Sequence, residues 1–289
     1  MKKALFGPAG NSDSFASVSK RSVDAPKWLR DMGLDAYEYQ CGNGVRLSAE
    51  TGAAIGAACA ENGIAPSLHA PYYISLANPE NVEKNIGYLL ASARAVTALG
   101  GRRITVHTGA VSGRPRAEAL ACAKAMVRVM CRALDEAGFG HVIPCLETMG
   151  KLGQLGTLEE VLALCQAEER LLPCIDFGHL YARSLGETEG YEATAALFDL
   201  LENALGRERA SGFHAHFSKI AYSKGGETRH LTFADPDFGP DYRPVMRLIA
   251  ERGYHPTVIC ESRGTQAEDA LEMKAYYHKM LEARPSSRT

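Results

Sequence analysis

The chain alternates between short apolar runs and longer segments in which apolar residues recur with helical spacing. Eight of the short runs are rich in β-branched and other apolar residues, and they recur about every 30–45 residues. We predict β-strands at residues 3–7, 35–40, 65–70, 103–107, 142–147, 172–176, 212–217 and 257–261. This spacing leaves room for a helix between each strand and the next.

The segments between these runs carry the local signals of helices. Asn62-Gly63 follows an alanine-rich segment and is typical of a helix end, while Pro115 suits a first helical turn. The run from Thr157 to Glu160 has the sequence of a capping box, which opens a helix. We predict helices at residues 53–61, 80–99, 115–138, from 157 onward, and at 191–205, 242–252 and 268–281.

Strands that alternate with helices indicate βα units and a parallel sheet. Eight such units in one chain predict a closed (β/α)8 barrel, that is, a TIM barrel. A doubly wound open sheet is the alternative architecture. Because no Pro/Ser/Gly-rich linker divides the chain, we expect residues 1–289 to form one α/β domain.

The composition excludes several classes of protein. The chain has 289 residues, 46% hydrophobic and 23% charged, as in an ordinary globular protein rather than a disordered, collagenous or disulfide-stapled one. Lys plus Arg is 32 and Asp plus Glu is 34, so the net charge is −2. Such a balance excludes binding to polyanions by bulk charge but leaves room for a basic rim around one site.

The sequence also bears on compartment and redox chemistry. No apolar run approaches the roughly 20 residues of a membrane span, and the apolar stretch after Lys2-Lys3 is too short for a signal peptide. We therefore expect a cytoplasmic protein without a membrane partner, and a monomer. The eight cysteines form no CxxC pair, so we interpret them as free, buried thiols.

Histidines and carboxylates stand at the ends of six successive predicted strands. These residues are His69, His107, Glu147, Asp176, His216 and Glu261. In a barrel the C-terminal ends of the strands meet at one mouth. A single histidine there is usually a hydrogen-bonded core residue, but clustered carboxylates repel one another unless a cation lies between them. The pattern therefore predicts a metal site.

The ligand types and their number restrict the metal. Imidazole and carboxylate groups without a thiolate suit zinc, manganese or iron(II). Seven or more candidate ligands exceed the need of one ion, so we expect two or three. A bridging carboxylate such as Glu147 would hold two ions roughly 3.5–4 Å apart, which suits hydrolysis of a phosphate ester. We expect His214, one layer deeper, to support the site, and His141, His255 and His278 to lie elsewhere.

Six motifs on these strands resemble those of endonuclease IV, the AP endonuclease family 2, within the xylose isomerase-like barrels. They are SLHAPY, ITVHTGA, CLETMG, IDFGH, HAHFS and ICES, and they occur in order from about Leu34 to the last predicted helix. The resemblance implies a (β/α)8 barrel with three zinc ions. It also implies cleavage of the DNA backbone 5′ to an abasic site.

The resemblance further implies a role for each matching residue. His69, His107 and Glu147 would hold the first zinc, and Glu147 would bridge to a second held by Asp176, His216 and Glu261. His179 and His230 would hold the third. Thr228 stands where the family has Asp, so either Glu227 enters the site, or the third zinc binds weakly, or it is absent.

Other residues would serve catalysis and substrate binding. Glu147 and Glu261 would be ligands first, and either could also orient the nucleophile. A third ion or Arg229 would neutralise charge on the leaving oxygen. Tyr72 and Tyr73 match the place where an aromatic side chain enters the DNA, although both could simply pack at the rim. Arg46 could replace the family's loop arginine. Basic residues near the mouth could bind phosphates: Arg114, Arg116, Lys151, Arg183, Lys219, Lys224, Arg229 and Arg263.

We therefore predict a zinc-dependent phosphodiester hydrolase, with Mn²⁺ as an alternative metal, that acts on DNA with abasic sites. The alternative is a sugar isomerase or epimerase, because Glu147, Asp176, His216 and Glu261 also match the four ligands of a single metal in sugar epimerases. A one-metal isomerase has no need of His69, His107, His179 and His230, which favours the nuclease. A third possibility is a metal-bearing protein that binds damaged nucleic acid without cutting it.

Overall fold

The eight predicted strands form one parallel sheet in a computed structural model that describes residues 2–284. The strand order is β1-β10-β7-β6-β5-β4-β3-β2. The strands are β1 (Leu5–Pro8), β2 (Ala36–Gln40), β3 (Ala65–His69), β4 (Arg103–His107), β5 (Ile143–Glu147), β6 (Leu172–Asp176), β7 (His214–Phe217) and β10 (Thr257–Cys260). Each overlaps one predicted strand.

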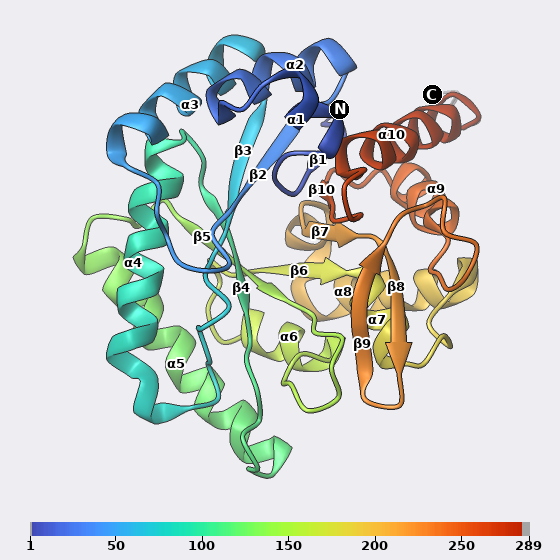
Figure 1. Cartoon of the computed structure of the whole chain (residues 1–289). Coiled ribbons are helices and arrows are strands. Elements are labelled where there is room, and N and C mark those ends of the chain that lie inside the picture. Colours follow the sequence, from blue (N-terminus) through green and yellow to red (C-terminus); the bar gives the residue numbers. More distant parts are fainter. Residues whose placement is uncertain (1, 285–289) are drawn as a thin grey trace.

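The two edges of this sheet meet, so that it curls into a near-closed barrel (Figure 1). Ala9 bridges Glu38 in parallel register, and the amide of Asp35 donates to the carbonyl of Phe6 at 2.8 Å. Gly7 allows this closure, since a Cβ there would lie 1.8 Å from the carbonyl oxygen of Ala36. The (β/α)8 prediction is confirmed, and the open-sheet alternative is wrong.

Helices connect the strands and cover the outside of the barrel (Figure 1). They are α1 (Asp13–Val18), α2 (Ala25–Met32), α3 (Ala49–Asn62), α4 (Val82–Ala98), α5 (Arg116–Glu136), α6 (Leu158–Cys165), α7 (Phe177–Arg183), α8 (Gly190–Ser211), α9 (Tyr242–Arg252) and α10 (Gln266–Glu282). The capping box at Thr157 is present and opens α6, and Gly63 ends α3 with φ of 66°. The short helices α1, α2 and α7 were not predicted.

The apolar core lies between the sheet and the helices. Leu68, Ile104, Leu146 and Ile175 are fully buried and belong to one cluster with the apolar faces of the helices. Because side chains alternate along a strand, their neighbours point into the barrel, and many of those neighbours are polar. All eight cysteines are free thiols and seven are buried, as predicted.

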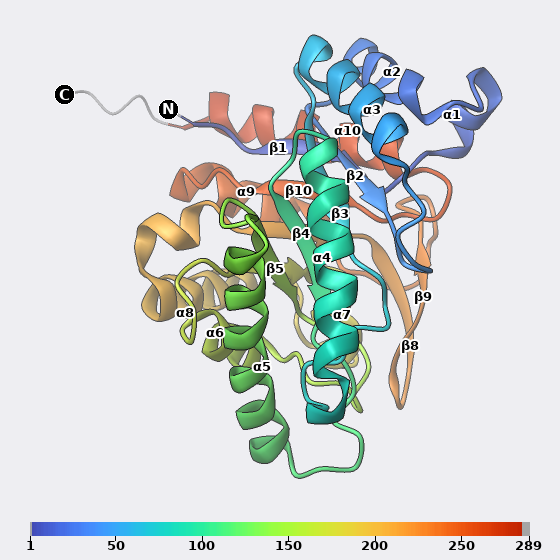
Figure 2. The same cartoon turned by 90° about the vertical axis from the view of Figure 1, so that its left-hand side faces the viewer.

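A second sheet, absent from the prediction, follows β7 directly. It is an antiparallel hairpin of β8 (Lys219–Ser223) and β9 (Gly226–Leu231), shown in orange in Figures 1 and 2. Since it begins two residues after β7 ends, it stands at the C-terminal end of the barrel, where it packs against α7. Gly225-Gly226 between two short alternating runs is the signal that could have predicted it.

Candidate metal centre

A cavity of about 340 Å³ opens at the C-terminal ends of the strands. It is lined by His69, Tyr72, His107, Glu147, Met149, Lys151, Gln154, His179, Glu227, His230 and Glu261. Most of the lining residues are therefore potential metal ligands, and with Asp176 and His216 they form three groups, of which the first two share Glu147.

The first group is His69, His107 and Glu147, at the ends of β3, β4 and β5. Nε2 of His69 lies 3.4 Å and Nε2 of His107 lies 3.0 Å from Oε2 of Glu147. Nδ1 of His69 lies 2.8 Å from the carbonyl oxygen of Ala70, which can only accept. The proton therefore sits on Nδ1, and the lone pair of Nε2 is free for a metal.

The second group is Glu147, Asp176, His216 and Glu261, whose ligand-type atoms all lie within 4.8 Å of one another. Nδ1 of His216 lies 3.3 Å from Oε1 of Glu147 and 3.4 Å from Oε1 of Glu261. Glu147 thus belongs to both groups, with one carboxylate oxygen turned to each.

The buried oxygens of these groups fit a divalent cation. Oε2 of Glu147 and Oδ2 of Asp176 are buried and accept no hydrogen bond within residues 2–284. An unsatisfied buried acceptor costs about 1–3 kcal/mol, so two in one cluster need an explanation. A cation held by imidazole nitrogens and carboxylate oxygens would satisfy both, and this donor set suits zinc or manganese.

Burial and neighbouring histidines shift the pKa values of the three carboxyls of the second group in different directions. Burial raises the pKa of Asp176 to about 6, and Glu261 and Glu147 add to the shift while His179 opposes it. Burial acts against the ionised form of Glu261, but His216 lowers the pKa of Glu261 to about 2. Burial is likewise outweighed at Glu147, where His107 and His216 hold the pKa well below its usual range. A cation would favour the ionised form of all three.

The third group is His179 from α7 with Glu227 and His230 from β9. Nε2 of His179 lies 3.3 Å from Oε2 of Glu227. The ring of His179 is oriented by its Nδ1, which lies 2.9 Å from the carbonyl oxygen of Thr148. His230 is oriented in the same way, with Nδ1 at 2.8 Å from Oγ of Ser218.

A β-bulge explains why Glu227 rather than Thr228 belongs to this group. On the hairpin Ala221 pairs with Arg229 and Tyr222 pairs with Glu227, so Thr228 is the extra residue. In a regular strand Thr228 and His230 would share a face. The bulge turns Thr228 away, where its hydroxyl donates to the carbonyl of Ala221 at 2.8 Å, and brings Glu227 to the face of His230.

The loop between β5 and α6 fixes Glu227 in this position. The amide of Glu227 donates to the carbonyl of Gly150 at 3.2 Å, and Lys151 bridges Gly226. Gly150 permits the contact, since a Cβ there would lie 2.6 Å from Cβ of Glu227.

Two arginines predicted to bind phosphate instead hold this loop. Arg183 donates to the carbonyls of Met149 and Lys151 at 3.0 and 2.9 Å. Arg116 forms an ion pair with Glu160 at 2.6 Å and donates to loop carbonyls. Most donors of Arg116 and several donors of Arg183 are therefore engaged within the protein.

The structure separates the two predicted aromatic residues. Tyr72 is about half exposed, lines the cavity, and its ring centroid lies 5.1 Å from that of His107. Tyr73 is equally exposed but does not line the cavity, and its ring packs on Tyr88 at 5.7 Å. The ring of Tyr73 is thus turned toward α4 and away from the cavity, and its contact with a substrate stays a prediction. Arg46 lines a neighbouring cavity of about 280 Å³ together with Tyr72.

Arg229 also differs from the prediction. It is exposed on β9 and is not among the residues that line the cavity. The bulge that brings Glu227 and His230 to one face leaves Arg229 off that face. The cation that does line the cavity is Lys151.

A buried carboxylate beneath the cavity escaped prediction. Glu38 on β2 is fully buried, and its Oε2 lies 3.0 Å from Nε2 of His214, which is also fully buried. His214 thus lies below the cavity in contact with Glu38, and its role in supporting the site stays a prediction. The signal was present, since Glu38 is the one charged residue in the run Ala36–Gln40. Two other histidines lie elsewhere: His141 contacts Thr97, and His255 contacts the carbonyl of Ser211.

Comparison with known proteins identifies the family of this chain. The sequence model of the xylose isomerase-like TIM barrel family matches residues 26–278. An uncharacterized protein of Methanocaldococcus jannaschii is 34% identical over 94% of this chain and 96% of its own length. A probable endonuclease 4 of Streptomyces avermitilis is 28% identical over 75% of this chain and 71% of its own length.

Solved structures share the fold at low sequence identity. Endonuclease IV from Thermus thermophilus has a TM-score of 0.67 at 20% identity and covers 98% of this chain and 100% of its own. A D-tagatose 3-epimerase-like protein has a TM-score of 0.65 at 20% identity and covers 86% of this chain and 90% of its own. Within residues 2–284, no helix is long and apolar enough to cross a membrane.

Proposed function

The chain belongs to the xylose isomerase-like TIM barrel family, and from that premise we propose that it is a metal-dependent phosphodiester hydrolase that cleaves DNA 5′ to abasic sites. The observation that supports this function most directly is that three ligand groups meet at one cavity and that two of them share Glu147. Relatives named probable endonuclease 4 and the fold of endonuclease IV add to that support.

The first and second groups would hold two neighbouring ions, and the third group would hold another, with zinc or Mn²⁺ as the metal. Bound divalent ions supply Lewis-acid polarisation of phosphoryl oxygens and lower the pKa of an attacking water. Glu147 would keep two ions adjacent through its two oxygens. Glu261 is the most exposed carboxylate of the second group and would orient the water.

The rim residues would select and position the substrate. Lys151 carries the positive charge at the cavity and would bind a phosphate or the leaving oxygen. Tyr72 would stack on the distorted nucleotide. A cavity of about 340 Å³ is too small for a duplex, so the abasic nucleotide would enter it flipped out of the helix.

A sugar isomerase or epimerase is the second candidate. It is favoured by the four ligand-type atoms of the second group and by the fold likeness to epimerases. An enzyme with one metal at the second group would leave His69, His107, His179 and His230 without a role. Because the first and third groups gather these four histidines into the same cavity, we favour the hydrolase.

Metal content and a nicking assay on the same preparation test the proposal. Protein purified without chelator should contain two or three zinc or manganese ions per chain. It should nick a duplex with one abasic site on the 5′ side and leave the undamaged duplex intact. Thr228→Val, which changes a residue turned away from the ligand groups, is the matched control and should keep full activity.

The other outcomes are equally informative. One ion per chain together with turnover of a ketose would establish the epimerase instead. Two or more ions with specific binding but no nicking of abasic DNA would overturn the hydrolase and indicate a protein that only recognises the lesion.

A further inference from the structure

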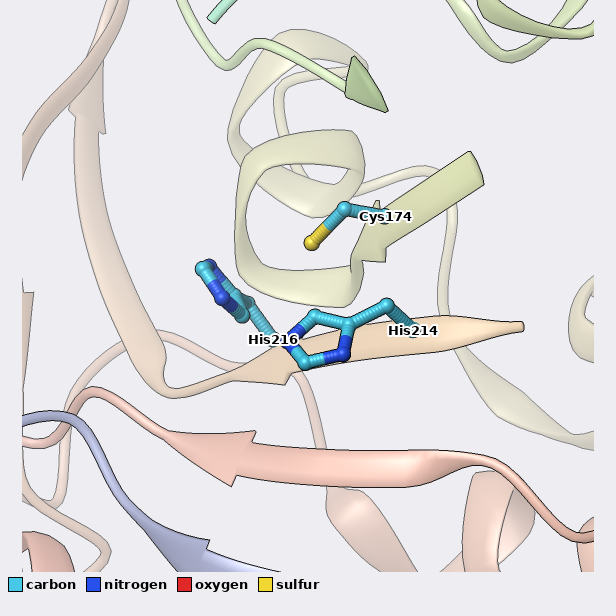
Figure 3. A group of neighbouring side chains, drawn as sticks. All are labelled: Cys174, His214 and His216. Carbon is cyan, nitrogen blue, oxygen red and sulfur yellow. The ribbon is translucent and has the colours of Figure 1, made fainter. Parts of the chain in front are cut away.

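Directly beneath the metal centre the barrel interior is polar, which is unusual for the core of a barrel. This polar tier consists of Glu38, Ser67, Thr105 and His214, and all four side chains are buried. Figure 3 shows His214 together with two neighbours of the tier, and in it Cys174 of β6 points toward the imidazoles of His214 and His216 on β7.

Glu38 is the centre of the polar tier. Its Oε2 accepts hydrogen bonds from Ser67 Oγ at 3.0 Å and Thr105 Oγ1 at 3.1 Å, and it lies 3.0 Å from Nε2 of His214. Its Oε1 accepts from Nε2 of Gln40 at 3.2 Å. Nε2 of His216 lies 3.0 Å from the same Oε1.

His216 therefore lies between two carboxylate layers. Its Nε2 faces Glu38 below, and its Nδ1 faces Glu147 and Glu261 above. Nδ1 forms a hydrogen-bonding contact with Oε1 of Glu147, whereas Nε2 lies at ion-pair distance from Glu38 without a hydrogen bond among residues 2–284. An ion at the second group would take the lone pair of Nδ1, and the proton would then lie on Nε2, facing Glu38. A carboxylate behind a ligating imidazole fixes both its orientation and its tautomer, and it strengthens the imidazole as a donor.

Stability alone does not account for Glu38. A buried ion pair is often no more stable than a well-packed apolar side chain of the same volume, because desolvation offsets the attraction. The neighbouring outward positions of this sheet are apolar and pack well. A carboxylate at this depth is therefore explained by what it does to its neighbours.

We propose that Glu38 is a positioning residue that acts through His216, holding the imidazole so that Nδ1 faces the second group. This inference rests on the metal-binding part of the proposed function and on no particular substrate. It concerns the ion of the second group alone, because the first group contains no ligand in contact with Glu38.

A competing interpretation is a further metal in the lower level itself. Ligand-type atoms of Cys174, His214 and His216 lie within 4.8 Å of one another. However, Nε2 of each histidine already lies 3.0 Å from Glu38, and neither Cys174 nor His214 lines the cavity above. Cobalt separates the two interpretations, since only an ion bound to Cys174 would give a thiolate-to-cobalt charge-transfer band.

The test compares Glu38→Gln with Thr105→Val in full-length protein. Glu38→Gln keeps the shape and removes the charge, whereas Thr105→Val removes one hydrogen bond to the same carboxylate and keeps the charge. Zn²⁺ and Co²⁺ affinities are measured by competition with a chelator. We expect Glu38→Gln to weaken one ion by about 10–100-fold and Thr105→Val to leave all ions nearly unchanged.

A double-mutant cycle shows whether the effect passes through His216. In a His216→Asn background, Glu38→Gln should cause no further loss of metal affinity, because the residue through which it acts is gone. Unfolding in chelator is measured for every variant, so a general loss of stability is recognised.

Three results would overturn the inference. They are equal effects of Glu38→Gln and Thr105→Val, an undiminished effect of Glu38→Gln in the His216→Asn background, and a thiolate-to-cobalt band that disappears in Cys174→Ser. A wild-type protein that binds no divalent metal would instead contradict the proposed function, so the two failures are distinguishable.

Discussion

The first and second ligand groups stand on strands of the barrel, whereas the third stands on a short helix and a hairpin outside it. Exposure does not separate them, because the side chains of His107 and Glu261 are 16% and 14% exposed and that of Glu227 is 16% exposed. The barrel strands are fixed on both sides by parallel pairing, for example Glu147 with Cys174 and Asp176 with His216. Among residues 2–284, the strands of the hairpin pair with each other, and their other backbone contacts are to loops, at Gly150, Lys151 and Gly239.

This difference shows where the site can change without loss of the fold. Moving a strand-borne ligand by one residue would turn it out of the barrel and break the register of its neighbours. On the hairpin, one bulged residue exchanges Thr228 for Glu227 at the third group and leaves the barrel untouched. We therefore expect the third group to hold its ion more weakly and to lose it first to a chelator.

Replacing the shared carboxylate should have the largest effect. Glu147→Gln removes an anionic oxygen from the first and second groups together, so both ions should be lost and nicking activity should fall by about 10³-fold or more. Elemental analysis and the nicking assay measure the two losses. Retention of both ions would mean that Glu147 does not connect the groups.

Glu261→Gln should act on one barrel group only. It removes the most exposed ligand of the second group, so activity should fall by about 10²–10³-fold while the ion of the first group remains bound. The barrel should stay folded, because Glu261 lies just beyond the end of β10. Full activity of this variant would contradict the assignment of the second group.

The third group allows a paired test on adjacent residues. Glu227→Gln should weaken one ion by about 10–100-fold, whereas Thr228→Val should leave all metal affinities unchanged, because the bulge turns Thr228 away. Chelator competition on both variants gives the answer. If Thr228→Val weakened the ion and Glu227→Gln did not, the bulge would lie elsewhere in solution.

The same contrast explains what the sequence could predict. His69, His107, Glu147, Asp176, His216 and Glu261 could be grouped because strand ends of a barrel converge, whatever the loops do. The position of Glu227 depends on a one-residue bulge and on contact with Gly150, neither of which has a periodic pattern. For that reason, the sequence alone could not decide whether Glu227 enters the site.

Two further residues show the limits of single-residue arguments. Arg229 was predicted to neutralise charge at the leaving oxygen because it precedes His230 in the sequence. On a bulged strand, however, the direction of a side chain does not follow from its position in the sequence. Glu38 went unnoticed because a lone acidic residue in a strand usually faces solvent. Its burial shows only in the structure, where Ser67, Thr105, His214, His216 and Gln40 surround it.

Asp176 links the two regions and gives a prediction for stability rather than for activity. One of its oxygens accepts a hydrogen bond from the amide of His179 at 2.7 Å, at the start of α7, while Oδ2 faces the second group unsatisfied. Burial raises its pKa to about 6 from 3.8 in the folded, metal-free protein. The unfolded chain therefore releases this proton more easily than the folded one.

The sign of the pH dependence follows from this shift. Below about pH 4 the carboxyl is largely protonated in both states and costs little, whereas between about pH 4 and 6 only the unfolded chain loses the proton, so the cost grows over this range and is complete above about pH 6. In chelator, Asp176→Asn should thus stabilise the fold by about 3 kcal/mol at pH 7.5 and by much less at pH 4. With metal present the order should reverse, since the variant loses a ligand of the second group. Urea unfolding of the wild type and of the variant at the two pH values, with and without metal, measures these differences in stability. If Asp176→Asn were less stable than the wild type in chelator at pH 7.5, protein contacts rather than a cation would explain the burial of Asp176.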